Sequence, residues 1–375
     1  MKRNQINSFL QEVFMEQFIV KGNTALTGNV KISGAKNAAV AVLPAAILTS
    51  ETVSIDNLPD ITDVRTMIAI LENLGVSIRR RGRNALELTP SGLSTIAPSY
   101  ELVKKMRASY YFMGSLLARF GRAEVPIPGG CDLGPRPIDQ HLKGFTALGA
   151  KISIEHGMIT LTADKLLGAR VYFDVVSIGA TMNLMLAAVA AEGRTVLENV
   201  AKEPEIVDLA NFLNAMGAMI RGAGTDVIRI DGVARFSGVR HTVIPDRIEA
   251  GTFMLAAAAT RGSVIVEDVI PKHLEAITAK LREIGARVEV EPEVIRVDGT
   301  SALVPSDLKT FPYPGFPTDL QPQGMVLLTA AKGLSVVTEN VFDGRFNHVD
   351  ELKRMGANIK VEGRTALVEG GIELS

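Results

Sequence analysis

One pattern recurs five times along the chain, and this repeat limits the possible folds more than any other feature. The copies are ILENLGVSIRR, FTALGAKISIE, FLNAMGAMIRG, LREIGARVEVE and LKRMGANIKVE. Their glycines, at positions 75, 149, 217, 285 and 356, are spaced 68 to 74 residues apart. A glycine directly after an amphipathic helix is typical of a C-cap. The alternating residues that follow predict a strand and then a hairpin.

A second shared pattern lies upstream in each copy: a helix of small apolar residues, a glycine and a β-branched strand. Examples are NLMLAAVAAEGRTVLENV, FMLAAAATRGSVIVEDV and MVLLTAAKGLSVVTENV. The repeating unit is therefore about β-α-β-α-β-β, which predicts an α/β (α+β) fold. Helices that are apolar on all faces belong inside a protein, so we expect the sheets to wrap around them.

The units suggest two domains, as does the length of 375 residues. Units one to three fill about residues 33–232, and units four and five fill about 244–370. The sequence stops after the hairpin of unit five, so we expect the second domain to lack a third unit.

Composition excludes several classes of function. The net charge is −1 and no block of like charge indicates a nucleic-acid or membrane partner. A single cysteine excludes an internal disulfide framework and suits a reducing cytoplasm. The first residues do not resemble a secretory signal, and the apolar runs of about ten residues are too short to cross a bilayer. The five histidines show no metal-ligand spacing, and we expect neither a metal nor a cofactor.

Charged or polar residues gather just before the apolar helices, where free backbone amides attract anions. This pattern suggests a polyanionic ligand between the domains. The single cysteine, Cys131, lies in the loop PGGCDLGPRPIDQH, where it is either a small buried side chain or a reactive thiol. Asp319 is either a helix cap or a functional carboxylate, and the EPEIVD segment is either a charged helix start or part of a site.

Several long segments together resemble UDP-N-acetylglucosamine 1-carboxyvinyltransferases, which are enolpyruvyl transferases. These segments are KISGAKNAA, MRAS…GGCDLGPRPIDQHLKG, EPEIVDLANFL, PDRIEAGTF, YPGFPTDLQ and FDGRFNHVDELKRMGA. The resemblance implies two inside-out α/β domains built from such units. It implies a first domain of residues 36–243 and a second of 15–35 with 244–375, incomplete at the C-terminus. From the sequence itself we expect residues 1–14, before Met15, to be a leader.

The implied reaction transfers the enolpyruvyl group of phosphoenolpyruvate to the 3′-hydroxyl of UDP-N-acetylglucosamine and releases phosphate, the first committed step of peptidoglycan synthesis. The resemblance assigns Cys131, on a mobile lid, as general acid and Asp319 as general base, with Lys36 and Asn37 also catalytic. The residues that it implies for substrate binding are Lys36, Asn37, Arg107, Arg136, Pro137, Ile138, Asp139, Gln140, Ser177, Ile178, Asp319, Val341 and Arg345.

The chain departs from the family pattern at two places where a basic residue is usual, which here are Thr62 and Val175. The resemblance implies that family members have a sixth unit with two further arginines. Without that unit, we expect an apolar patch and open strand edges to be exposed in this chain. Two alternatives stay open: a non-catalytic protein that binds UDP-N-acetylglucosamine, and a transferase acting on shikimate 3-phosphate.

Overall fold

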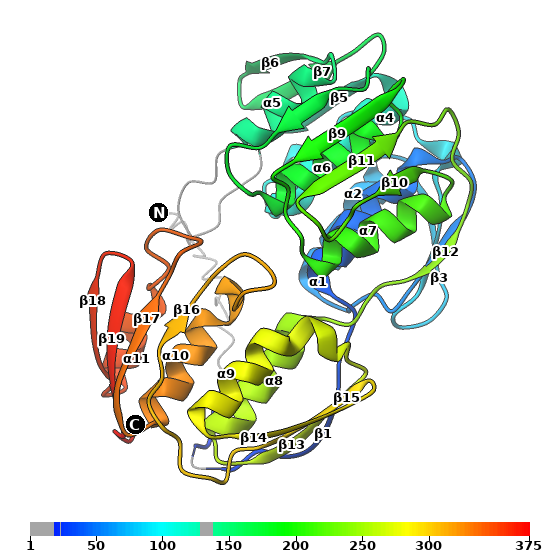
Figure 1. The fold of residues 1–375 in the computed structure, drawn as a ribbon. Helices are drawn as coiled ribbons and strands as arrows, with labels where there is room; N and C mark the ends of the chain where they lie inside the picture. The colour runs from blue at the N-terminus through cyan, green and yellow to red at the C-terminus, as the bar shows by residue number, and fades with distance from the viewer. Residues whose placement is uncertain (1–18, 23, 128–137) are drawn as a thin grey trace, which may run out of the picture.

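The computed structural model describes residues 19–22, 24–127 and 138–375, and Figure 1 shows their arrangement in two lobes. The α-helices are α1 (Lys36–Ala45), α2 (Thr62–Asn73), α3 (Tyr100–Val103), α4 (Tyr111–Phe120), α5 (Asp139–Ala147), α6 (Ile178–Ala188), α7 (Pro204–Ala215), α8 (Arg247–Ala259), α9 (Glu275–Ile284), α10 (Gln321–Ala330) and α11 (His348–Arg354). The short 3₁₀ turns are η1 (Ala46–Leu48), η2 (Pro90–Gly92), η3 (Arg107–Tyr110), η4 (Pro271–Leu274) and η5 (Thr318–Leu320).

Among the described residues, the strands form four small mixed sheets and one antiparallel sheet. They are β1 (Thr27–Lys31), β2 (Val53–Asp56), β3 (Ser77–Arg80), β4 (Leu86–Thr89), β5 (Arg122–Pro126), β6 (Lys151–Glu155), β7 (Met158–Thr162), β8 (Arg170–Tyr172), β9 (Arg194–Glu198), β10 (Met219–Arg221), β11 (Val227–Asp231), β12 (Arg240–Thr242), β13 (Ser263–Glu267), β14 (Arg287–Glu291), β15 (Val294–Asp298), β16 (Leu308–Lys309), β17 (Gly333–Thr338), β18 (Asn358–Glu362) and β19 (Thr365–Gly370). The prediction of an α/β fold is confirmed.

The repeat identified in the sequence is visible in the backbone. The five glycines follow α2, α5, α7, α9 and α11, and each has a φ between 93° and 105°. Side chains with a Cβ rarely adopt this left-handed conformation, so glycine ends each helix at little cost. A hairpin follows each time, and its second strand pairs with the strand that follows the apolar helix of the same unit.

Four sheets share one order, in which a leading strand pairs in parallel with the strand after the apolar helix. Their orders are β12-β2-β4-β3, β8-β9-β11-β10, β1-β13-β15-β14 and β16-β17-β19-β18. The sheet β5-β7-β6 has three strands in the part of the chain that is described. Two leading strands come from distant parts of the sequence, because β12 joins the sheet of the first unit and β1 joins that of the fourth.

The apolar helices lie inside the sheets, as their composition predicts. In α6 every residue from 180 to 188 is buried, and in α1 every residue from 38 to 45 is buried. The second strand of each hairpin alternates between buried residues and more exposed ones, so each sheet has one face on a core. One core takes its residues from positions 35–243 and defines the N-terminal lobe. The other takes Ile32 and positions 250–368 and defines the C-terminal lobe. The expected domain boundaries remain a prediction.

Exposed apolar side chains of the C-terminal lobe lie on several elements. They include Val326 on α10, Leu334 on β17 and Leu367 on β19. The expected continuous apolar patch in this lobe remains a prediction. No helix in the described part of the chain has the length and hydrophobicity needed to cross a membrane.

Candidate functional site

The two lobes are joined by two crossing segments that pair with each other. Gly34 and Pro245 form an antiparallel bridge, and the amide of Ala35 donates to the carbonyl of Ile244 at 2.7 Å. A Cβ on Gly34 would lie 1.7 Å from the carbonyl oxygen of Asn57, so this crossing needs glycine. The crossing segments lead directly into the helix starts that carry the predicted site residues.

Lys36 is the first residue of α1 and lies where the helices of both lobes begin. Its backbone amide donates to Asp246 Oδ2 at 2.9 Å, while Asp246 Oδ1 accepts from the amides of Ile248 (2.7 Å) and Glu249 (3.0 Å). One carboxylate therefore caps α8 and holds the start of α1. The Lys36 ammonium is half-exposed and pairs with Asp63 at 2.6 Å, so a bound anion would compete with that carboxylate for the cation. Asn37 is the next residue of α1.

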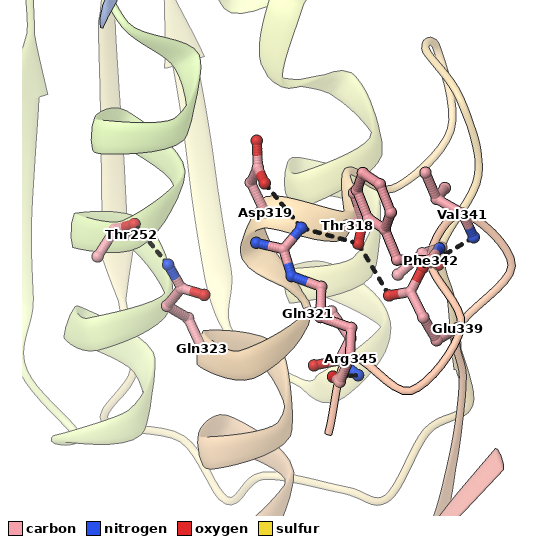
Figure 2. A network of polar contacts seen from close by, with 10 residues as sticks. Thr252, Thr318, Asp319, Gln321, Gln323, Glu339, Val341, Phe342 and Arg345 are labelled. Atoms are coloured by element: carbon pink, nitrogen blue, oxygen red, sulfur yellow. Dashed lines mark hydrogen bonds and ion pairs between the residues drawn. The ribbon is translucent and has the colours of Figure 1, made fainter. Parts of the chain in front are cut away.

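Asp319 and Arg345 form the corresponding cluster in the C-terminal lobe, shown in Figure 2. Arg345 donates to Asp319 Oδ1 at 2.8 Å and to Thr318 Oγ1 at 3.1 Å. The arginine side chain is mostly buried, whereas that of Asp319 is 42% exposed. Arg345 therefore orients a carboxylate that solvent, and hence a substrate, can reach.

Glu339 is a buried carboxylate that sequence reasoning missed. Its two oxygens accept from the hydroxyls of Thr310 (2.8 Å) and Thr318 (2.9 Å) and from the amides of Val341 (2.8 Å) and Phe342 (3.1 Å). Figure 2 shows Glu339 between Thr318 and the loop of Val341 and Phe342. Glu339 thereby holds the loop of Val341, a predicted substrate residue, against the turn of Asp319. The only hint in the sequence was its place at the end of the unit-five strand, because these partners are 21 to 29 residues away or in the next loop.

A buried charge cluster connects α7 of one lobe with α8 of the other. Arg247 is 8% exposed, and its Nε donates to Glu205 Oε1 at 3.1 Å. Its guanidinium lies 5.7 Å from the ring centroid of Tyr313, whose backbone amide donates to Glu203 Oε1 at 3.4 Å. Arg247 also interacts electrostatically with Asp319. The EPEIVD segment, ambiguous in the sequence, thus meets the PDRIEAGT segment at the lobe junction.

The acidic residues of this cluster are only partly satisfied by hydrogen bonds. The second oxygens of Glu203, Glu205 and Asp208 are buried with no hydrogen-bond partner among the described residues. Asp208 Oδ1 lies 3.1 Å from His241 Nε2. Burial raises the pKa of the Glu203 carboxyl above its usual value. The junction is therefore sensitive to any change in the charge of Arg247.

The candidates for sugar-nucleotide binding gather at three helix starts in the N-terminal lobe. Arg107 begins η3, Asp139 begins α5 after Ile138, and Ile178 begins α6. Ser177 caps α6, because its Oγ accepts from the amide of Ala180 at 3.2 Å. Cys131, Arg136 and Pro137 lie outside the described residues.

The side chain of Gln140 is engaged within the protein. It is buried, its Nε2 donates to Asp139 (2.9 Å) and Asp174 (3.2 Å), and its Oε1 accepts from the amide of Asp174 at 3.0 Å. Gln140 thus ties the start of α5 to the segment before α6. Of the two departures noted above, Thr62 is the first residue of α2 and Val175 is 60% exposed in that same segment before α6.

The fold identifies the class of protein first. The enolpyruvyl transferase NikO from Streptomyces tendae superimposes with a TM-score of 0.83 at 24% identity, covering 93% of this chain and 83% of that one. EPSP synthase from Acinetobacter baumannii gives a TM-score of 0.69 at 19% identity, covering 94% and 84%. The chain therefore has the enolpyruvyl transferase fold.

Sequence comparison then identifies the family. The sequence model of EPSP synthase (3-phosphoshikimate 1-carboxyvinyltransferase) matches residues 20–375. Relatives named UDP-N-acetylglucosamine 1-carboxyvinyltransferase include those of Caldanaerobacter subterraneus subsp. tengcongensis (57% identity, covering 95% of this chain and 85% of the relative), Geobacillus kaustophilus (57%, 96% and 84%) and Bacillus subtilis (55%, 96% and 84%). The chain belongs to the EPSP synthase family of enolpyruvyl transferases and, within it, to the UDP-N-acetylglucosamine 1-carboxyvinyltransferases.

Proposed function

We propose that this chain transfers the enolpyruvyl group of phosphoenolpyruvate to the 3′-hydroxyl of UDP-N-acetylglucosamine and releases inorganic phosphate. The observation that supports this most directly is 57% identity, over 95% of the chain, to a relative named UDP-N-acetylglucosamine 1-carboxyvinyltransferase. The proposal gives the protein a role in peptidoglycan and cell-wall synthesis, and it implies a location in the cytoplasm. Through the cell wall, the protein would contribute to cell shape, the cell cycle and cell division.

The reaction needs a proton at carbon 3 of the enol and the sugar oxygen at carbon 2. A tetrahedral intermediate then loses phosphate and a proton to restore the double bond. Asp319, held by Arg345 and partly open to solvent, is our candidate for the base that accepts the hydroxyl proton. Cys131 is our candidate for the acid, because nearby cations can bring a thiol pKa toward neutrality.

Cationic side chains on both lobes support this assignment. Lys36 begins α1, and Arg345 lies beside Asp319, so each lobe offers a fixed positive charge to an anionic substrate. We propose that these two, with Asn37 and Arg136, bind phosphoenolpyruvate. We propose that Arg107, residues 136–140, Ser177, Ile178 and Val341 bind the sugar nucleotide.

The test is phosphate release by the purified 375-residue protein with phosphoenolpyruvate and each acceptor in turn. We expect release with UDP-N-acetylglucosamine and none with shikimate 3-phosphate. Release only with shikimate 3-phosphate would reassign the substrate. Tight binding of UDP-N-acetylglucosamine by a folded protein that releases no phosphate would favour the non-catalytic alternative.

A further inference from the structure

A buried asparagine in the N-terminal lobe fixes the protonation pattern of a buried histidine. Asn183 Nδ2 donates to the carbonyl of Tyr110 at 2.9 Å and lies 3.0 Å from His141 Nδ1. Asn183 Oδ1 accepts from the amide of Gly114 at 2.8 Å, so the amide cannot be flipped without two clashes of like groups. Because an NH₂ group only donates, His141 Nδ1 must accept, and a neutral ring must carry its proton on Nε2.

These contacts connect the three elements that carry the sugar-nucleotide candidates. Asn183 belongs to α6, His141 to α5, and Tyr110 to η3, the turn that begins with Arg107. The rings of Tyr110 and His141 meet edge to face, with centroids 4.8 Å apart at 68°. Asn183 is fully buried and His141 is 4% exposed, while Tyr110 is partly buried against the core.

The first turn of α6 rests directly on this pair of rings. A Cβ on Gly179 would lie 2.4 Å from the Tyr110 hydroxyl oxygen and 3.3 Å from His141 Cε1. Glycine is therefore needed for α6 to approach the two rings, and the rings limit how closely its first turn can pack. Ser177 and Ile178, the candidates at this helix start, immediately precede Gly179.

The histidine ring is neutral in this setting. Burial, followed by the positive charge of Arg107, lowers the pKa of His141 to about 3, while Asp139 acts weakly in the opposite direction. A neutral ring can accept from Asn183 without repelling Arg107. An apolar side chain at this position would leave an Asn183 N–H buried and unpaired, which is costly.

We propose that His141 is a positioning residue for sugar-nucleotide binding: through Asn183 and Tyr110 it holds the start of α6 and Arg107 in the arrangement that receives the diphosphate. This proposal rests on the proposed function. His141 acts through its neighbours and does not touch the substrate.

The experiment compares His141→Leu with His141→Asn, whose side-chain oxygen can still accept from Asn183. The matched control is Phe145→Leu, a buried change on the same helix outside the hydrogen-bonded set. The readouts are the Kd for UDP-N-acetylglucosamine by calorimetry and the KM for each substrate. We expect His141→Leu to raise the Kd for UDP-N-acetylglucosamine about tenfold, which is equivalent to about 1.4 kcal/mol of binding free energy. We expect a much smaller change in kcat and in the KM for phosphoenolpyruvate.

His141→Asn should regain most of the affinity, and Phe145→Leu should keep it although it destabilises the lobe. Unchanged affinity in His141→Leu, or an equal loss in Phe145→Leu, would overturn the proposal.

If His141→Leu does not fold, ¹⁵N-histidine NMR of the wild type decides: an Nε2–H neutral ring from pH 5 to 8 is expected, and an Nδ1–H or charged ring contradicts the proposal. If the wild type shows that ring state but does not bind UDP-N-acetylglucosamine, the proposed function fails and the positioning role fails with it. Loss of binding confined to His141→Leu supports both.

Discussion

Replacing Arg247 by methionine should strongly destabilise the contact between the two lobes. The guanidinium is 8% exposed and is the cation that pairs with Glu205, whose side chain is 4% exposed. Methionine keeps most of the apolar stem and its packing, so the change removes chiefly the positive charge. The Glu205 carboxylate would then remain buried beside Glu203 without its guanidinium partner.

The expected loss is about 4 kcal/mol in the free energy of unfolding, because removing one partner of a buried ion pair costs about 3–5 kcal/mol. Changing Glu205 to leucine in the same chain removes the stranded charge together with its partner. The double variant should therefore recover most of the loss, since apolar replacement of a whole buried pair is often neutral.

Urea unfolding followed by circular dichroism measures these differences, and the sequence contains no tryptophan to follow instead. The matched control is Arg170→Met, which breaks the exposed Arg170–Glu198 pair of β8 and β9 and should have a much smaller effect. A loss below about 1 kcal/mol in Arg247→Met would refute the reasoning. A double variant no more stable than Arg247→Met would do so as well.

Three further changes test separate parts of the site. Glu203→Gln should stabilise the protein increasingly as pH rises above about 4.5, by up to about 1.4 kcal/mol per pH unit, because the raised pKa means that the folded state holds a proton that the unfolded chain releases. Below that pH the two proteins should differ by a constant amount in urea unfolding, and a constant difference up to pH 8 would contradict burial of the carboxyl. Asp246→Ala removes the cap of α8 and the bond to the Lys36 amide, so we expect a loss of about 2–3 kcal/mol and a higher KM for phosphoenolpyruvate. Asp246→Asn keeps a capping oxygen and should lose less, and equal losses would argue against the cap. Cys131→Asp should keep part of the phosphate-release activity and resist thiol-alkylating epoxides such as fosfomycin; equal inactivation by the epoxide would exclude this thiol as the target.

The periodic features of the fold could be predicted from short segments. Each helix-glycine-strand copy is specified by local chemistry, since a left-handed residue after a helix favours glycine wherever it occurs. The apolar composition of α1 and α6 likewise predicted burial on all faces. The same local patterns did not reveal that β12 supplies the leading strand of the first sheet, because that pairing joins residues 186 positions apart in the chain and carries no short-range signal.

The candidate site likewise contains some residues that the sequence revealed and others that only the structure revealed. Lys36, Asp319 and Arg345 were recognisable from the motifs around them, and the structure places them at helix starts and turns of the two lobes. Glu339 and Asn183 were missed because a buried polar residue looks ordinary in sequence until its partners are known. The roles of all these candidate residues stay predictions, and Cys131, Arg136 and Pro137 lie outside the described residues.

The order of residues was enough to determine the repeating unit, its helix ends and the inward position of the alanine-rich helices, because these depend on neighbours within a few turns. Only the tertiary structure decided how charge is distributed where the lobes meet. At that junction Arg247 pairs with Glu205, 42 residues away, and Asp246 holds the amide of Lys36, 210 residues away. Burial there turns ordinary polar side chains into groups that must be paired, as it does for His141 and Asn183 inside the N-terminal lobe.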